Sequence, residues 1–493
     1  MNNGKICISV AAETADEMIA KIKQAEQLAD VIEVRFDSLR PDELLRAREI
    51  VDSTTKPKIS TFRPLTQGGF RELSESERDA FWCSGLGTAL CDVEEEFVEV
   101  TKAWPWGERI CSYHDFDGVP ADLESKVACL KETEAEKIKV ALTANDITDS
   151  ISVWNVLTGS KPHSTIPVAM GDAGKWTRIL GLAHGAFLTY ASLESGDETA
   201  PGQVSANDLI EVYRVKEFDK DTKVFGVIGN PISQSMSPYM HNPAFVELGV
   251  NAVFIPFLVK NIDEFIRRMV KPETREVELN FGGFSVTMPH KQSIIPHLDA
   301  IDEVAKAIGA VNTVRIDDNG KLTGYNTDAH GFITPLKAKY GDLRDANVAV
   351  FGAGGAARAV VYALKQEGAN VTVFARDAAK GSAFADEFGV TFAQPVHFEA
   401  DFDVVVNATP LGMKAPLEND SIVTADDLMN AKLVFDLVTK PFDTPLIAEA
   451  IKAGASTIGG IEMLVAQGAK QFEIWTGKPG PAELMMETLR SRM

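Results

Sequence analysis

The stretch NVAVFGAGGAARAVVYALKQEGANVTVFARD (Asn347–Asp377) contains a strand, a glycine turn, a helix and a second strand. The apolar run Val348–Phe351 predicts the first strand, and GAGGAAR (Gly352–Arg358) follows it directly. Glycines at this place let the backbone approach a pyrophosphate at the start of the next helix. The stretch therefore predicts a Rossmann-like βαβ unit that binds a dinucleotide.

The end of the second strand of this unit indicates which dinucleotide binds. An NAD-binding chain carries Asp or Glu there to hold the ribose hydroxyls, whereas this chain has Arg376. An arginine suits a 2′-phosphate, so NADP is the expected cofactor. Asp377 comes next, and its carboxylate would repel the phosphate if it pointed inwards.

Length and composition limit the possible classes. The 493 residues predict about two to four domains, and 45% hydrophobic with 24% charged residues is typical of a soluble globular protein. No apolar run reaches about 18 residues, so no membrane span is expected. The start, MNNGKICISV, moves straight into a strand-like run, so no signal or transit peptide is expected.

Charge and cysteines narrow the classes further. The net charge of −22 argues against binding to nucleic acid or an anionic membrane. The five cysteines form no CxxC pair, and their number is odd, which argues against a disulfide framework or a structural zinc site and fits the cytoplasm. We expect small-molecule partners, no metal, and a monomer rather than an oligomer.

Residues 1–215 alternate short apolar runs with helix-like stretches at the rhythm of a (β/α)8 barrel, within an overall α/β fold class. The expected strands are Ile6–Val10, Val31–Arg35, Lys58–Phe62, Thr88–Asp92, Arg109–Tyr113, Lys137–Leu142, Ser164–Ala169 and Ala186–Tyr190.

After a charged linker at 214–222, the pattern predicts a module of two α/β domains. The first is expected over residues 222–330 and is completed by about 458–493. The second, Rossmann-like and NADP-binding, is expected over residues 331–457. Ile458–Gly477 in the tail has the pattern of one long amphipathic helix.

Polar residues gather at the expected carboxyl ends of the barrel strands, where barrel enzymes carry their chemistry. A lone Lys139 would more often be a strand-edge lysine, and a lone His114 a loop histidine, but the convergence favours a site. The set comprises Glu33, Arg35, Arg63, Asp92, Glu94, His114, Lys139, Arg178 and Gln203.

This set suits imine catalysis. A buried lysine near arginines is nucleophilic, because burial disfavours its charged form, and it condenses with a ketone to give an iminium. His114 could remove the acidified proton and later protonate a leaving hydroxyl, while Arg178 holds a carboxylate. Lys137, two residues earlier on the same strand face, remains the alternative nucleophile.

A second polar set lies between residues 235 and 328, and it suits a small polyhydroxylated acid. Lys291 and Asp328 could deliver a proton to a carbonyl oxygen as a hydride arrives at the carbon. A purely structural explanation of Ser235 and Ser237 is that one caps the N-terminus of a helix and the other is a spare hydroxyl. The set comprises Ser235, Ser237, Thr287, Lys291, Asn312 and Asp328.

Over about residues 4–215 the chain resembles the type I 3-dehydroquinate dehydratase family. The resemblance rests on VIEVRFD (Val31–Asp37), STFRPLTQGG (Ser60–Gly69), YHDF (Tyr113–Phe116), KVALTA (Lys139–Ala144) and APGQV (Ala200–Val204). It implies that Lys139 is the Schiff-base lysine, His114 the general acid/base and Glu33 its support. The implied substrate-binding residues are Arg35, Arg63, Arg178, Thr199 and Gln203.

Over about residues 222–493 the chain resembles the shikimate dehydrogenase family. The motifs, in order, are NPISQSMSP, SVTMPHK, AVNTV, YNTDAHGF, GAGGAAR, NATPLGM and EMLVAQGAKQF. The resemblance implies catalysis by Lys291 and Asp328. The implied substrate-binding residues are Ser235, Ser237, Thr287, Asn312 and Gln467, and the implied cofactor-binding residues are Gly352, Ala353, Gly354, Gly355, Ala356, Arg376, Thr409 and Met413.

The two resemblances together imply a bifunctional enzyme of the shikimate pathway. Its barrel would dehydrate 3-dehydroquinate, and the second module would reduce the product to shikimate with NADPH. The alternatives are a second module that acts on quinate with NAD, and a non-catalytic quinate-pathway sensor.

Overall fold

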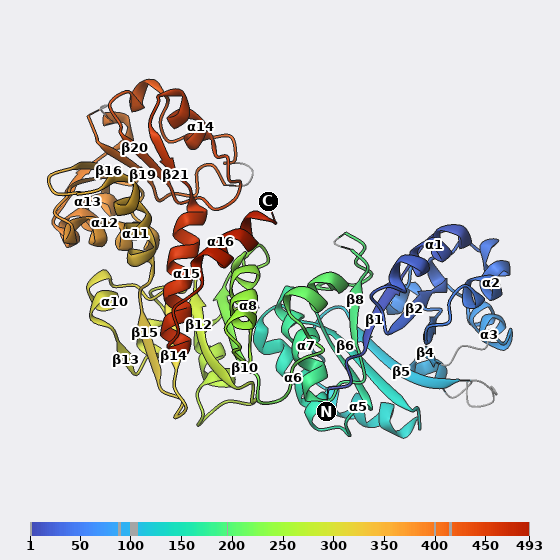
Figure 1. The fold of residues 1–493 in the computed structure, drawn as a ribbon. Helices are drawn as coiled ribbons and strands as arrows, with labels where there is room; N and C mark the ends of the chain where they lie inside the picture. The colour runs from blue at the N-terminus through green and yellow to red at the C-terminus, as the bar shows by residue number, and fades with distance from the viewer. Residues whose placement is uncertain are drawn as a thin grey trace. The chain divides into compact units, whose positions relative to one another are not determined.

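The computed structural model describes residues 2–86, 90–98, 107–194, 196–398, 401–413 and 417–492. The chain forms two compact units (Figure 1). The first contains Met1–Val224, Asn230–Gln234 and Asn251–Phe281. The second contains Phe225–Gly229, Ser235–Val250 and Gly282–Met493. Among the described residues, no helix combines the length and apolarity needed to cross a membrane.

The first unit contains a (β/α)8 barrel, which confirms the predicted fold. Its strands pair in parallel in chain order, and β1 also pairs with β8. The Phe187 amide donates to Thr165 O at 2.9 Å, which joins the segment just before β8 to β7. Residues 88–89 of the predicted strand Thr88–Asp92 lie outside the described residues. The strands are β1 (Ile6–Val10), β2 (Val31–Arg35), β3 (Lys58–Thr61), β4 (Leu90–Glu94), β5 (Glu108–Asp115), β6 (Lys137–Thr143), β7 (Thr165–Met170) and β8 (Thr189–Ser192), followed by the short β9 (Val204–Ser205).

The barrel strands are buried along nearly their whole length, because helices cover their outer face and side chains fill the interior. Cys7, Ile59, Ile110 and Ile166 belong to one buried cluster formed by these strands. The helices are α1 (Ala15–Ala25), α2 (Ala47–Asp52), α3 (Glu75–Cys83), α5 (Leu123–Glu132), α6 (Ser150–Thr158) and α7 (Lys175–Leu180), and the unit also holds β11 (Ala252–Leu258) and α9 (Ile262–Phe265).

In the second unit, a mixed sheet has the order β10-β12-β14-β15-β13, with β14 antiparallel to both neighbours. The tail forms the predicted long helix and a second, shorter helix beyond it, and Trp475 Nε1 of the first donates to Val314 O at 3.0 Å, which ties the tail to β14. The elements are β10 (Lys223–Gly229), α8 (Ser237–Glu247), β12 (Phe281–Val286), β13 (Ala300–Ile301), α10 (Glu303–Ile308), β14 (Thr313–Ile316), β15 (Leu322–Tyr325), α15 (Gly460–Thr476) and α16 (Ala482–Arg490).

The other sheet of this unit is Rossmann-like, as predicted. Its parallel strands have the order β18-β17-β16-β19-β20-β21, so the direction of winding reverses between β16 and β19. Ligands of such sheets bind beyond the carboxyl ends of the strands at this reversal. The elements are α11 (Asp328–Tyr340), β16 (Asn347–Phe351), α12 (Gly355–Gln366), β17 (Asn370–Phe374), α13 (Ala378–Phe388), β18 (Thr391–Ala393), β19 (Val404–Asn407), β20 (Leu433–Asp436), α14 (Pro445–Lys452) and β21 (Ser456–Ile458).

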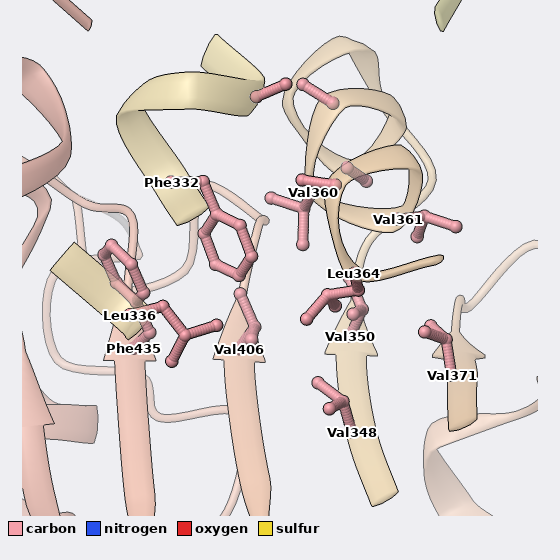
Figure 2. Packing of buried hydrophobic residues seen from close by; sticks show 14 of the residues in the cluster. Phe332, Leu336, Val348, Val350, Val360, Val361, Leu364, Val371, Val406 and Phe435 are labelled. Carbon is pink, nitrogen blue, oxygen red and sulfur yellow. The ribbon is translucent and has the colours of Figure 1, made fainter. Parts of the chain in front are cut away.

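Helices α11 and α12 cover one face of this sheet with apolar side chains spaced four residues apart (Figure 2). Phe332 of α11 stacks on Phe435 of β20 with ring centroids 5.0 Å apart. Val360 and Leu364 of α12 belong to the same buried cluster as Val350 of β16. This core fixes the junction between β16 and α12, where the glycine turn lies.

Candidate active sites

The residues predicted for the barrel lie together in one pocket at the carboxyl ends of the strands. They are Glu33, Arg35, Arg63, His114, Lys139, Arg178, Thr199 and Gln203.

Lys139 of β6 is buried in this pocket and forms an ion pair. Its Nζ lies 2.8 Å from Asp92 Oδ2 of β4, and Arg63 Nη2 lies 2.8 Å from the same oxygen, as a charge contact without hydrogen-bond geometry. Arg63 Nε also donates to Glu94 Oε1 at 3.2 Å. Burial by itself would raise the pKa of Asp92, but Arg63 and Lys139 lower it overall. Asp92 is therefore a carboxylate that holds two cations.

Lys137 has a different setting at the start of β6. It is half-buried, and its Nζ lies 4.9 Å from the ring centroid of Phe187. It is not among the residues that line the pocket. The geometry thus favours Lys139 over Lys137 as the nucleophile.

His114, at the end of β5, is buried, and neither of its ring nitrogens has a hydrogen-bond partner among the described residues. Burial lowers its pKa below the usual histidine value, and the positive charges of Arg63 and Lys139 lower it further. A neutral imidazole with both nitrogens available is suited to accept a proton from a bound molecule.

Glu33 lines the same pocket as His114, and its own hydrogen bonds come from residues of the neighbouring strands. Its two carboxylate oxygens accept hydrogen bonds from Ser9 Oγ and, at 2.8 Å, from Thr61 Oγ1. Burial would raise the pKa of Glu33, but Lys139 and Arg35 lower it overall. Glu33 therefore acts on the pocket as a fixed negative charge.

Arg178 and Arg35 differ in what they can bind. Two guanidinium nitrogens of the buried Arg178, Nε and Nη2, have no hydrogen-bond partner among the described residues, and burial lowers its pKa to about 10. An unpaired buried cation is costly, so this position suits an anion from a ligand. Arg35 is already held by Asp37 through bonds of 2.7 and 3.1 Å and by Gly68 O at 3.0 Å.

The loop after β8 brings Thr199 and Gln203 to the pocket. Gln203 Nε2 donates to Thr199 Oγ1 at 3.1 Å, and the Thr199 amide donates to Gln203 Oε1 at 2.8 Å. Gly202 between them has φ +74°, and a Cβ there would lie 2.3 Å from Gly171 O. Glycine is required at this turn, because it lets the loop approach the end of β7.

In the second unit, Lys291 and Asp328 form the predicted pair. Lys291 Nζ lies 2.5 Å from Asp328 Oδ2, and Asn312 Nδ2 donates to Asp328 Oδ1 at 2.7 Å. Asp328 is the first residue of α11, where the helix dipole favours a carboxylate. Lys291 is only half-buried, so its ammonium can reach a ligand while Asp328 holds it.

Asn312 also joins Gln467 of α15 to this pair. Its Nδ2 lies 3.5 Å from Gln467 Oε1, and its Oδ1 accepts from the Thr327 amide at 2.8 Å. Ser235 and Ser237 lie side by side at the start of α8, where the Ser237 amide donates to Ser235 Oγ at 3.3 Å. The hydrogen bonds between described residues do not link these serines or Thr287 to Lys291.

The predicted cofactor residues surround the reversal point of the Rossmann-like sheet. Gly352 has φ +117°, and a Cβ there would lie 2.8 Å from Ala408 O of the strand β19 connection, so the turn requires glycine. Gly354 is exposed, with no atom within 4 Å of where its Cβ would be. A Cβ on Gly355 would lie 3.5 Å from Lys291 Cδ, so the start of α12 opens beside Lys291. Ala353 and Ala356 lie in the same half-buried turn.

Arg376 and Asp377 follow β17, and their side chains have different settings. Asp377 is the N-cap of α13, and its Oδ1 accepts from the Lys380 amide at 3.0 Å. Its carboxylate is therefore engaged by the helix, while Arg376 is exposed. Thr409 donates to Asn407 Oδ1 through both its amide, at 3.0 Å, and its hydroxyl, at 2.7 Å, and Met413 is exposed. The residues present fit a dinucleotide with a 2′-phosphate.

Sequence reasoning gave no role to three residues in or beside the barrel pocket. Asp92 and Glu94 were expected at the mouth, and their alternation along β4 signals inward-facing carboxylates. Tyr190 of β8 also lines the pocket, with its ring centroid 4.5 Å from Lys139 Nζ. Nothing in the sequence distinguishes Tyr190 from an ordinary core residue.

Family models match both parts of the chain. The model of type I 3-dehydroquinase matches residues 6–220. The shikimate dehydrogenase substrate binding domain matches residues 227–314, shikimate/quinate 5-dehydrogenase matches residues 335–442, and the shikimate 5′-dehydrogenase C-terminal domain matches residues 460–490.

One relative spans both parts. The chloroplastic bifunctional 3-dehydroquinate dehydratase/shikimate dehydrogenase of Arabidopsis thaliana is 36% identical over 519 residues, which cover 99% of this chain and 84% of the relative. The NADP(+) shikimate dehydrogenase of Methanococcus maripaludis strain C7 is 40% identical over 56% of this chain and 99% of its own length. A crystal structure of a shikimate dehydrogenase in complex with NADP+ is 39% identical, with a TM-score of 0.51, over 55% of this chain and 96% of its own. The chain belongs to the family of bifunctional 3-dehydroquinate dehydratase/shikimate dehydrogenases.

Proposed function

We propose that the first unit dehydrates 3-dehydroquinate to 3-dehydroshikimate and that the second unit reduces this product to shikimate with NADPH. One observation carries the proposal: each unit holds its predicted lysine in an ion pair with an aspartate, and the two settings differ. Lys139 is 5% exposed beside an aromatic ring, whereas Lys291 is half-buried beside the start of α12. The first setting suits a covalent nucleophile and the second a proton donor.

In the dehydratase, Lys139 attacks the substrate ketone as a neutral amine after giving up a proton, and loss of water leaves an iminium. The iminium draws electrons from the adjacent carbon, so neutral His114 removes a proton there. His114 then returns the proton to the leaving hydroxyl, which departs as water. A second water hydrolyses the iminium and frees Lys139.

The remaining pocket residues hold the substrate. Arg178 binds the substrate carboxylate, because its two unpaired nitrogens can each donate a hydrogen bond to one carboxylate oxygen. Arg63, Thr199 and Gln203 bind the carboxylate and hydroxyls. Glu33, and Arg35 with its Asp37 partner, set the charge of the pocket floor.

In the reductase, bound NADPH supplies the hydride. Lys291 donates a proton to the carbonyl oxygen, and Asp328 keeps its ammonium in place through the 2.5 Å contact. Asn312 orients Asp328 through its 2.7 Å hydrogen bond. Ser235, Ser237, Thr287, Asn312 and Gln467 bind the hydroxyls and carboxylate of the substrate.

Arg376 is assigned to the 2′-phosphate, the turn Gly352–Ala356 to the pyrophosphate, and Thr409 and Met413 to the remaining wall of the cofactor site. The α12 N-terminus supports the pyrophosphate assignment, because helix starts favour anions. The domain division that we propose is 1–215, 222–330 with 458–493, and 331–457. We also propose a cytoplasmic monomer, which is supported by the free cysteines and by sites whose assigned residues come from one chain.

The test is purified protein given 3-dehydroquinate with either NADPH or NADH. Shikimate formation with consumption of NADPH is expected, at a lower rate with NADH. Oxidation of quinate with NAD in preference to shikimate with NADP would favour the alternative second module. An absence of turnover with every substrate would favour the sensor.

A further inference from the structure

Tyr190 lies in the dehydratase pocket against the reacting nitrogen. It is the second residue of β8, paired in register with Cys7 of β1, and only 4% of it is exposed. Lys139 Nζ lies over its ring, 4.5 Å from the ring centroid. The same nitrogen contacts Asp92 Oδ2 at 2.8 Å, so it has a carboxylate and an aromatic face as neighbours.

The number of hydrogen bonds that this charged nitrogen can donate falls during the proposed reaction. As an ammonium it has three N–H donors for hydrogen bonds, whereas the iminium has one. The positive charge stays, but its capacity for hydrogen bonds falls. A ring face attracts a cation without requiring an N–H, and this attraction is stronger in a site that excludes water.

We propose that the ring of Tyr190 is a catalytic residue of the dehydratase, which stabilises the iminium on Lys139 through its aromatic face. The inference rests on the proposed Schiff-base function of Lys139. Tyr190 of β8 stabilises the positive charge that acidifies the carbon next to the iminium. Asp92 of β4 holds Lys139 before the iminium forms.

The hydroxyl of Tyr190 is not the part that the inference requires. Its oxygen is buried and has no hydrogen-bond partner among the described residues. Burial raises the pKa of this phenol, and the nearby Glu33 raises it further. The side chain therefore stays neutral, so the contact with Lys139 is that of a ring face and not of a phenolate.

The experiment distinguishes the electrostatic effect of the ring face from the effect of the side chain's shape. Tyr190→Phe keeps the ring face, Tyr190→Leu removes it, and Tyr190 replaced by phenylalanines with increasing numbers of fluorines weakens the face with little change of shape. The matched control is Phe187→Leu, which removes the ring beneath Lys137, 4.9 Å from its Nζ, outside the pocket. Each variant is measured for dehydratase kcat, for trapping of the iminium by borohydride, and for reductase activity.

We expect Tyr190→Phe and Phe187→Leu to keep near-normal kcat. Tyr190→Leu should lose roughly 2- to 30-fold in kcat and in the trapped fraction. In the fluorinated series, dehydratase kcat should fall stepwise as each added fluorine weakens the attraction of the ring face for the cation. Reductase activity should be unchanged. A fluorinated series with constant kcat would overturn the inference alone. A lack of borohydride labelling on Lys139 in the unaltered protein would instead overturn the proposed function on which it rests.

Discussion

Lys139 Nζ of β6 lies 2.8 Å from Asp92 Oδ2 of β4, and both side chains are buried. The same aspartate oxygen contacts Arg63, so two buried cations share one carboxylate. A buried charge that loses its partner is costly, whereas an exposed ion pair adds little. The stability of the barrel therefore depends on Asp92, which also holds the nucleophile Lys139 in place.

Asp92→Asn should destabilise the barrel by about 3–5 kcal/mol, because it leaves Lys139 and Arg63 without their shared carboxylate. The matched control is Asp52→Asn, which removes the partner of Arg48 in an exposed pair and should cost about 0–1 kcal/mol. Hydrogen–deuterium exchange of peptides from β4 and β6 measures the change locally. Equal exchange in the two variants would contradict the paired role of Asp92.

The dehydratase should stay active to a lower pH than an ordinary histidine base would allow. The pKa of His114 is lowered by burial and by Arg63 and Lys139, so the ring stays neutral as the pH falls below about 6.5. Activity is lost only as the pH passes down through this lowered pKa. The profile of kcat/KM against pH measures it, because this ratio reports the free enzyme. An acidic limb at or above pH 6.5 would be inconsistent with a neutral buried His114.

His114→Ala should reduce dehydratase kcat by roughly 10²- to 10⁴-fold, the usual contribution of a positioned acid/base. His163→Ala is a suitable control, since His163 lies outside the pocket and its ring Nδ1 contacts Asn3 and the Ala186 carbonyl. Reductase activity should be normal in both variants. A small effect of His114→Ala would assign the proton transfer to another group.

Lys291→Met should abolish most reductase activity, by roughly 10²-fold or more, and leave dehydratase activity unchanged. Asp328→Asn should act in the same direction, because it removes the 2.5 Å contact that holds the ammonium. Lys306→Met, on the nearby helix α10, provides a control that removes a lysine from a solvent-facing position. If both activities fell together in Lys291→Met, the change would be structural rather than catalytic.

Arg376→Ala should raise KM for NADPH by roughly tenfold or more, because a charge-assisted bond to a phosphate contributes about 1.5–3 kcal/mol. The KM for NADH should change little. The neighbouring Asp377→Ala should leave the preference for NADPH intact and instead cost about 0.5–2 kcal/mol of stability, since Asp377 caps α13. The reverse pattern would exchange the assigned tasks.

The sequence predicted the elements whose signals are local. The strand Ile6–Val10 has the predicted bounds, and the Rossmann turn follows β16 as the glycines indicate. The pairing of Asp92 with Lys139 joins residues 47 positions apart, and such contacts depend on which strands the barrel makes neighbours. The tail helix α16 was missed, because Pro479 and Gly480 end the amphipathic pattern of α15 before a second helix begins.

The site could be predicted where a motif fixes both the residue and its surroundings, as for Lys291 and Asp328. The hydrogen-bond partners of a site residue could not be predicted, because they depend on which strands and helices become neighbours. Glu33 was expected to support His114, but the sequence did not show that Ser9 and Thr61, on the flanking strands β1 and β3, donate hydrogen bonds to its oxygens. Asp377 could repel or avoid a phosphate, and only the cap geometry decides.

The central claim is that one chain carries two successive reactions with separate lysines. Formation of shikimate from 3-dehydroquinate and NADPH by Lys139→Met, by Lys291→Met and by an equal mixture of the two variants tests it most directly. Each variant alone should form no shikimate, and the mixture should restore it, because the first product diffuses from one intact barrel to another chain's intact reductase. Shikimate formation by Lys139→Met alone, or a mixture that stays inactive although each variant keeps its other activity, would contradict the claim.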